Sequence, residues 1–418
     1  MKKALILILI SHFTAAYAQE QNNPSFKGEL LTINDAVKTA VEFNPGLNSL
    51  RENLNLAKSS YFKSFGIYSP NISYMKEGID KTGDSFAERR WTISQKLDFP
   101  LKTIYNLNSI SSEETAISYK IQSEEKALIA DVKRSYVKLV YAYRKIELMD
   151  EQLRLSQKLH DAVKARTEVG VSSELDLLRA EIQKSEAENE LENSYKNYHD
   201  TRYELFSIIG LDPEEQSYST YFTDTLSYRA IEIDQEEAIS RIKLQPEYLA
   251  MEAEQKSKNY KQSASWSSLL PDLEFRYYWQ DYGSSYNFNG FEIGLNVPIW
   301  FVFNQQPEIE IAGIEVKKLE FQKREIYLRY KEVIEKTWHG YEASLKNMKR
   351  FEQNIQNKSS ELLTLTTEGY SAGEISLFDL ITAQQTYLRT RNNYFSALRD
   401  YYFQLIELEK YLDEELVY

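Results

Sequence analysis

The residue types that carry out most enzymatic and metal chemistry are scarce in this chain of 418 residues. It has no cysteine, which excludes disulfides, thiolate metal sites, cysteine nucleophiles and a lipid anchor on cysteine. Its four histidines are far apart in sequence, so a multi-histidine metal site is not expected. There is no nucleophile–base set, no phosphate-cradling glycine loop and no metal-ligand spacing. We therefore expect no enzymatic activity, no cofactor and no metal site.

Two carboxylates are candidate functional groups, and each lies in a Ser-x-x-Asp motif at the start of a predicted helix. They are Asp176 and Asp379, which lie six residues after Gly170 and Gly373 respectively. A carboxylate at this position caps the helix and interacts favourably with the helix dipole. Capping alone therefore accounts for both aspartates, and a turn with positive φ alone accounts for both glycines.

These landmarks belong to a tandem repeat of about 200 residues, in which four positions recur in the same order. The matched pairs are Pro45 and Pro246, Pro70 and Pro271, Pro100 and Pro298, and Gly170 and Gly373. We assign the first repeat to 19–210, a linker to 211–233 and the second repeat to 234–418.

Helix breakers are few, with 14 glycines and nine prolines, and this predicts long helices. In the first repeat we expect helices over 33–65 (a short one over 33–43 and a second over 47–65), 101–169 and 171–209, and strands at about 70–79 and 88–98. In the second we expect helices over 246–270, 304–369 and 374–415, and strands at about 271–281 and 288–298. Parts of the long helices carry apolar residues at the 4-3 spacing of a coiled-coil seam.

The predicted strands have one apolar and one polar face, as in the alternation of Leu273, Phe275 and Tyr277 with polar neighbours. Amphipathic strands of about ten residues are typical of transmembrane β-barrels. A soluble β-sandwich packed on helices is the alternative. Four strands cannot enclose a water-filled lumen, and lipid does not tolerate open sheet edges. A barrel therefore requires several copies of the chain, whose long helices continue it as a cylinder.

The N-terminus predicts export. Lys2 and Lys3 precede the apolar stretch 4–10, and the cleavage pattern at 16–18 completes a signal peptide over 1–18, although a buried first helix is an alternative. The net charge of −13 argues against nucleic-acid binding. Mean hydropathy is −0.53, and no later apolar run approaches the length of a spanning helix. An exported chain without disulfides fits a bacterial envelope protein.

Together these features resemble the TolC-like outer-membrane efflux protein family. The resemblance rests on the ordered duplicate landmarks, on the segment 31–36 followed by Asn44-Pro45, and on the segment 370–373 followed by Phe378-Asp379-Leu380. It implies a mainly α-helical fold with a small β part. Three copies would each contribute four strands to a twelve-stranded transmembrane β-barrel and coiled-coil helices to a periplasmic tunnel.

The resemblance also implies a function and partners. The homotrimer would be an exit duct in the outer membrane of a Gram-negative bacterium, with most of each chain in the periplasm. A periplasmic adaptor (membrane fusion) protein would open its entrance, and substrate delivered by an inner-membrane pump would pass outward passively. A soluble periplasmic coiled-coil scaffold is the competing interpretation, and an envelope hydrolase is a distant third.

By the same resemblance, the hairpin turns dock the adaptor and close the entrance. The adaptor-docking residues would be Gly170, Val171, Ser172, Gly373, Glu374 and Ile375. Asp379 and Thr382 would line the entrance aperture, where Thr382 replaces a second acidic residue and halves the expected ring charge. Asp176 and Tyr370 would form a latch between neighbouring hairpins. Ile375 replaces the basic partner of that latch, which predicts a weaker or differently built one.

Overall fold

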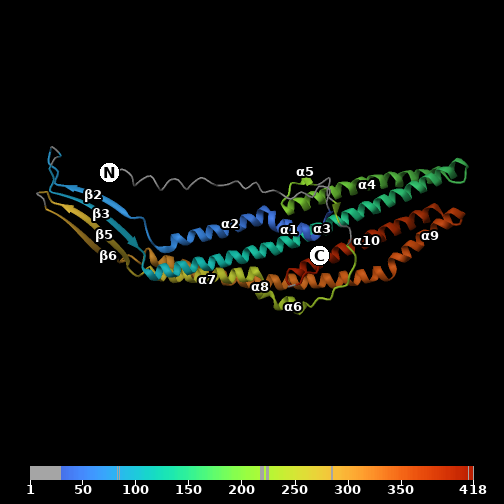
Figure 1. Cartoon of the computed structure of the whole chain (residues 1–418). Helices are drawn as coiled ribbons and strands as arrows, with labels where there is room; N and C mark the ends of the chain where they lie inside the picture. The colour runs from blue at the N-terminus through green and yellow to red at the C-terminus, as the bar shows by residue number, and fades with distance from the viewer. Residues whose placement is uncertain are drawn as a thin grey trace.

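The computed structural model describes residues 30–81, 83, 85–216, 221–222, 226–283, 286–412 and 414–417, and the predicted signal peptide over 1–18 lies outside them. The chain forms one elongated body, with a β-sheet at one end and the turns of two helical hairpins at the other (Figure 1). It is mainly α-helical with a small β part, so the predicted fold class is confirmed at the level of one chain.

The first repeat combines two short helices, a β-hairpin and a long helical hairpin. Its elements are β1 (Leu30–Leu31), α1 (Ile33–Phe43), α2 (Pro45–Ser60), the 3₁₀-helix η1 (Tyr61–Phe65), β2 (Asn71–Glu77), β3 (Glu88–Leu97), α3 (Pro100–Glu168) and α4 (Glu174–Ile209). The 69 residues of α3 form a helix of about 100 Å. Between the repeats lie α5 (Pro213–Gln216) and β4 (Tyr221–Phe222), and β4 pairs in parallel with β1.

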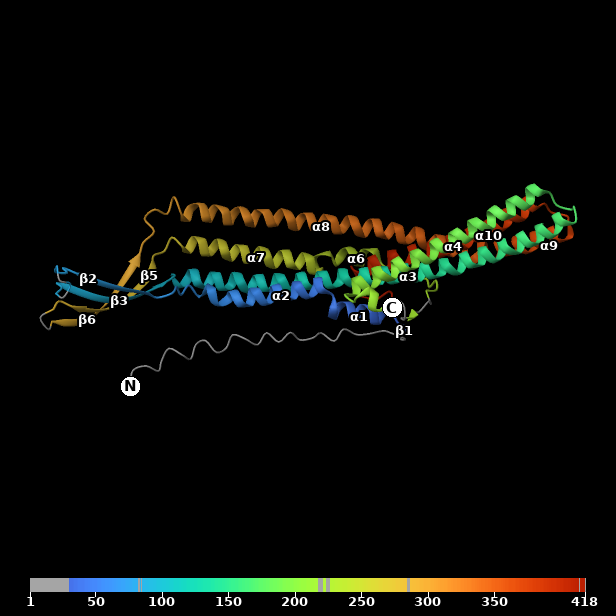
Figure 2. The same cartoon turned by 90° about the horizontal axis from the view of Figure 1, so that it is seen from above.

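The second repeat follows the same order. Its elements are α6 (Gln235–Ser240), the 3₁₀-helix η2 (Ile242–Leu244), α7 (Pro246–Ser267), β5 (Asp272–Asp281), β6 (Asn287–Asn296), α8 (Gln305–Arg350), the π-helix η3 (Phe351–Ile355), α9 (Gln356–Ala372) and α10 (Leu377–Glu409). Figure 2 shows α8, α7 and α3 running side by side from the sheet end of the molecule.

Local capping sets where several predicted helices begin. The two helices predicted within 33–65 are separated at Asn44, whose side-chain oxygen accepts a hydrogen bond from the Leu47 N–H at 3.0 Å and starts α2 at Pro45, two residues before the predicted start. The helices predicted to begin at 171 and 374 begin three residues later, because Ser173 and Ser376 are their N-caps. The helix predicted to end at 415 ends at Glu409.

The helix predicted over 304–369 is interrupted by a turn of π-helix at η3. There the Tyr394 ring of α10 packs edge-on against Phe351 at 6.0 Å, and its hydroxyl donates to Glu352 at 3.1 Å. Burial, together with the Glu352 carboxylate, raises the pKa of Tyr394 to about 12. The phenol is therefore neutral and donates this hydrogen bond at physiological pH.

The four long strands form one antiparallel sheet in the order β2-β3-β5-β6, so the two hairpins are joined through β3 and β5. The register aligns Trp91 with Trp279 and Leu97 with Leu273, which brings the apolar positions of all strands to one face. That face carries Ile72, Tyr74, Trp91, Ile93, Leu97, Leu273, Phe275, Tyr277, Trp279, Phe291, Ile293 and Leu295.

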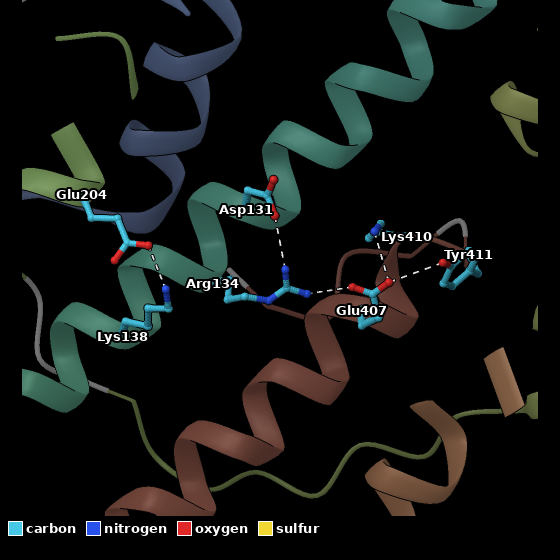
Figure 3. Close-up of polar contacts among 7 residues, drawn as sticks. All are labelled: Asp131, Arg134, Lys138, Glu204, Glu407, Lys410 and Tyr411. Atoms are coloured by element: carbon cyan, nitrogen blue, oxygen red, sulfur yellow. Dashed lines mark hydrogen bonds and ion pairs between the residues drawn. The ribbon is translucent and has the colours of Figure 1, made fainter. Parts of the chain in front are cut away.

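The main hydrophobic core lies midway along the rod, where α1, α3, α4, α8 and α10 meet. Charged side chains set the register of these helices around it (Figure 3). Arg134 of α3 bonds Glu407 of α10 at 2.7 Å, and Lys138 of α3 bonds Glu204 of α4 at 2.8 Å. Lys133 is only 1% exposed, and its ammonium pairs with Glu409 and with Glu415. The pairs made by Arg134 and Lys133 tie the first repeat to the end of the second.

Candidate functional site: the hairpin turns and the amphipathic sheet

The turn between α3 and α4 is built around Gly170. Its φ is 76°, and a Cβ there would meet nothing within 4 Å, so glycine is favoured by the backbone conformation and not by crowding. The N–H groups of Val171 and Ser172 donate to the Arg166 carbonyl at 2.8 and 3.2 Å, which closes the end of α3. The Val171 side chain is left exposed at the turn.

The turn between α9 and α10 repeats this geometry. Gly373 has a φ of 82° and also has no atom near its missing Cβ. The N–H groups of Glu374 and Ile375 donate to the Gly369 carbonyl at 2.9 and 3.3 Å. Both turns lie at the end of the rod farthest from the sheet (Figure 1). All six residues expected to dock a partner are therefore at one end of the molecule.

Both aspartates are partners of the serine that caps their helix, Ser173 for α4 and Ser376 for α10. The Asp176 N–H donates to the Ser173 hydroxyl at 3.1 Å, and that hydroxyl donates to the Asp176 carboxylate at 2.8 Å. Asp379 and Ser376 form the same pair, at 3.2 and 2.6 Å. The capping interpretation thus describes each residue within the single chain. It leaves an additional role among several chains open, because the Asp379 side chain is exposed.

Thr382 lies one turn after Asp379 on α10 and is also exposed. Its hydroxyl donates to the Phe378 carbonyl of its own helix at 2.8 Å, so it adds no charge beside Asp379.

Tyr370 is 7% exposed and packs with Leu159, Val163, Ala180, Leu377 and Leu380 in a small core that joins the two hairpins. Its hydroxyl is buried and has no hydrogen-bond partner among the described residues. Asp176 instead pairs with Ser173 and lies 3.7 Å from Arg179. Within the described part of one chain, the two predicted latch residues are therefore not bonded to each other.

The structure adds Arg166, which sequence reasoning missed. Its guanidinium lies 4.6 Å from the centre of the Tyr370 ring and donates to the carbonyls of Tyr370 and Ser371 at 3.2 and 3.3 Å. A cation at the C-terminal end of α9 is favoured by the helix dipole as well as by the ring face. A basic residue is thus present at this turn, supplied by α3 and not by position 375.

The sheet has an exposed apolar face and a charged face. On the apolar face Phe291 is 77% exposed, although it lies at the middle of its strand. On the opposite face Arg276 pairs with Glu274 and Glu292, at 3.0 and 3.2 Å. Within the described chain, β2 and β6 each pair on one side only. An apolar face, a charged face and two unpaired edges are the features expected of part of a β-barrel wall that has lipid on one side and water on the other.

A second exposed apolar surface follows α8. Ile314, Phe321 and Leu328 are spaced by seven residues and are 65%, 74% and 55% exposed. Seven-residue spacing places side chains on one stripe of a helix, as in a coiled-coil seam. Within the described chain this seam is not covered by another helix, so it is suited to pack against a second molecule.

Among the described residues, no three or more His, Cys, Asp or Glu side chains are arranged to hold a metal ion. No helix in this part of the chain is long and apolar enough to cross a bilayer.

Comparison with known proteins gives a family match over part of the chain and a shared fold over most of it. Residues 48–211 match the family described as outer membrane efflux protein, while no curated protein sequence matches the chain. The outer membrane protein VceC of Vibrio cholerae is 13% identical with a TM-score of 0.78, over 91% of this chain and 95% of that one. The CmeC outer membrane channel of Campylobacter jejuni is 16% identical with a TM-score of 0.71, over 91% and 85%.

The MtrE outer membrane channel of Neisseria gonorrhoeae, in an open state, is 15% identical with a TM-score of 0.73, over 91% of this chain and 88% of that one. The family match spans the first repeat from α2 to the end of α4, and the structural likeness extends over both repeats. The resemblance to the TolC-like outer-membrane efflux proteins is therefore confirmed, by the match to the outer membrane efflux protein family over 48–211 and by a fold shared with solved outer membrane proteins along most of the chain.

Proposed function

We propose that three copies of this chain form a passive duct through the outer membrane of a Gram-negative bacterium. The observation that carries the proposal is the four-stranded sheet with one exposed apolar face, one charged face and two open edges. Lipid accepts such strands only when every edge is paired, and strands from sister copies pair them. Three copies supply twelve strands, with the charged face lining a water-filled lumen.

The helices extend this duct into the periplasm. The seam of Ile314, Phe321 and Leu328 on α8 gives each copy a surface for the helices of the next. The helix α3, about 100 Å long, is then one of the helices that form the tunnel wall. The hairpin turns form the tunnel mouth, where a periplasmic adaptor docks and an inner-membrane pump delivers substrate.

The entrance is closed at the mouth by contacts between hairpins. Asp379 lines the aperture beside Thr382, and Asp176 and Tyr370 take part in the latch, where the buried Tyr370 hydroxyl has a free donor. Arg166 supplies the positive charge of the latch and holds the end of α9 against α3. Adaptor docking separates the hairpins by breaking these contacts, and substrate then diffuses outward.

The test is expression in a Gram-negative host, followed by membrane fractionation, detergent extraction and planar-bilayer recording. The proposal predicts a processed chain in the outer-membrane fraction, a heat-modifiable trimer in mild detergent, and discrete conductance steps. A chain that is soluble without detergent, or monomeric in it, would support the periplasmic scaffold instead.

A further inference from the structure

The connection from sheet to long helix differs between the two repeats. In the first repeat only residues 98 and 99 separate β3 from α3. In the second repeat eight residues, 297–304, separate β6 from α8. Figure 2 shows this longer connection turning at the sheet end of α8. The second repeat therefore carries an added turn at the junction of the sheet and the helices.

The added turn is uncharged and exposed. Five consecutive apolar residues, Ile299, Trp300, Phe301, Val302 and Phe303, are 74%, 71%, 45%, 50% and 75% exposed. The counterpart in the first repeat is two residues long and is not exposed. Asp98 is buried and accepts hydrogen bonds from Tyr68 at 3.0 Å and from Lys102 at 2.9 Å, and Phe99 is half-buried. Exposure of a continuous apolar segment in water is unfavourable, so this segment needs a partner.

The backbone of the turn satisfies much of its own hydrogen bonding. Phe303 N–H donates to the Trp300 carbonyl at 3.1 Å, and the N–H groups of Asn304 and Gln306 donate to the Phe301 carbonyl at 3.3 and 2.9 Å. Ile299 N–H donates to the carbonyl of residue 297 at 2.9 Å. These hydrogen bonds within the turn matter in a lipid environment, because lipid offers the backbone no hydrogen-bond partners.

The position of the turn also favours lipid. It follows Leu295, which lies beside Leu273 and Leu97 at the helix end of the sheet's apolar face. The helices that lead into the sheet at this end expose further aromatic side chains, Phe62 in η1 and Trp266 in the last turn of α7. Aromatic residues gather where a barrel crosses the boundary between headgroups and acyl chains.

We propose that Ile299–Phe303 is a membrane-interface anchor, inserted among the headgroups and upper acyl chains of the leaflet that faces the helices. The inference rests on the proposed function, because it needs a bilayer around the sheet. A second copy is a poorer occupant: a helix seam such as that on α8 presents every seventh residue, whereas consecutive apolar residues around a turn point in several directions. A fluid apolar medium contacts all of them, and a single protein face does not.

Tryptophan fluorescence tests this proposal, since the chain has five tryptophans. Three single-tryptophan proteins retain Trp300, Trp279 or Trp338, with the other four changed to phenylalanine. Each is reconstituted in phosphatidylcholine vesicles that carry bromine at a shallow or a deep acyl position. Trp279 on the apolar face of β5 reports on the barrel, and Trp338 in α8 packs against the main core and serves as the unquenched control.

The expected result is loss of Trp300 emission, larger with shallow than with deep bromine, together with loss of Trp279 emission and none for Trp338. Quenching of Trp279 without quenching of Trp300 would contradict the anchor but not the proposed barrel. No quenching of either would overturn the proposed function itself.

The doubly substituted W300S/F303S protein gives a second measurement. It should be extracted from membranes at a lower detergent concentration than the unsubstituted protein, and equal extraction would count against the anchor.

Discussion

The two repeats follow one plan, but they differ in what they leave exposed. In the first, α3 runs unbroken for 69 residues and packs against α2, α4, α7 and α10. After the exposed Leu101 and Ile104 at its start, α3 has exposed polar positions such as Glu113 and Gln122. In the second, α8 carries the apolar seam and is preceded by the apolar turn Ile299–Phe303. The exposed helix seam and the exposed apolar turn thus both belong to the second repeat.

The repeats also differ in continuity. The π-helix η3 divides the second long helix into α8 and α9, while α3 has no such interruption. A π-turn weakens the regular hydrogen-bond ladder and often marks a functional position. The hairpin of α9 and α10 is thus the one with a break in its helix, 17 residues before the end of α9.

The largest effect should come from a charge in the exposed seam of the second repeat. Phe321→Glu removes about 2 kcal/mol of apolar burial from each interface of a trimer and places a carboxylate there. Because the loss recurs at three interfaces, we expect the trimer to dissociate in mild detergent. Size-exclusion chromatography with light scattering measures this.

The matched change in the first repeat is Gln122→Glu, which adds the same charge to an exposed polar position of α3. It should leave the trimer intact. If both variants dissociate, the contrast between the repeats does not explain assembly.

A smaller effect should follow removal of the ion pair that joins the repeats. Lys133→Ala leaves the Glu409 carboxylate, whose side chain is 14% exposed, without its cation, which costs about 3 kcal/mol. Ile334, found 201 residues later and fully buried, is the apolar counterpart, and Ile334→Ala should cost a similar amount through its cavity. Guanidinium unfolding of both variants measures the comparison.

The control is Lys138→Ala, because Lys138 and Glu204 form an exposed pair whose loss costs less than about 1 kcal/mol. An equal loss of stability in Lys133→Ala and Lys138→Ala would show that burial does not increase the contribution of the Lys133 ion pairs to the free energy of unfolding.

The sequence predicted those elements whose signal is local. The alternation around Tyr277 indicates a strand, and the Ser-x-x-Asp motifs mark the starts of α4 and α10 to within three residues. Contacts between residues far apart in the sequence could not be predicted in this way. Nothing near Arg166 in the sequence indicates that its side chain reaches the end of a helix about 200 residues away. The joining of the hairpins through β3 and β5 likewise depends on the folded chain.

The next prediction concerns the two hairpins at the tunnel mouth. Arg166→Ala removes two hydrogen bonds to helix-terminal carbonyls and a cation–π contact, which together contribute about 1.5 kcal/mol for a half-buried side chain. Since about 1.4 kcal/mol is tenfold in an equilibrium, we expect roughly tenfold more open channels at rest. Single-channel recording measures the open fraction.

Arg179→Ala is the control for this variant. Arg179 lies on the adjacent hairpin helix, and its side chain is 52% exposed and 3.7 Å from Asp176. It should leave the open fraction unchanged. An open fraction that rises equally in both variants would remove Arg166 from the latch.

The smallest effects should separate capping from a role in the aperture. Asp176→Ala and Asp379→Ala remove equivalent carboxylates, each the partner of an N-cap serine, so each should cost about 0.5 kcal/mol of stability. Only Asp379→Ala should also reduce the preference of the channel for cations, because three copies of its carboxylate would ring the entrance of the proposed trimer. Reversal potentials in a salt gradient measure that preference. If the two variants lower stability equally and leave selectivity equal, Asp379 is a helix cap and nothing more, and the two turns are equivalent in function as they are in geometry.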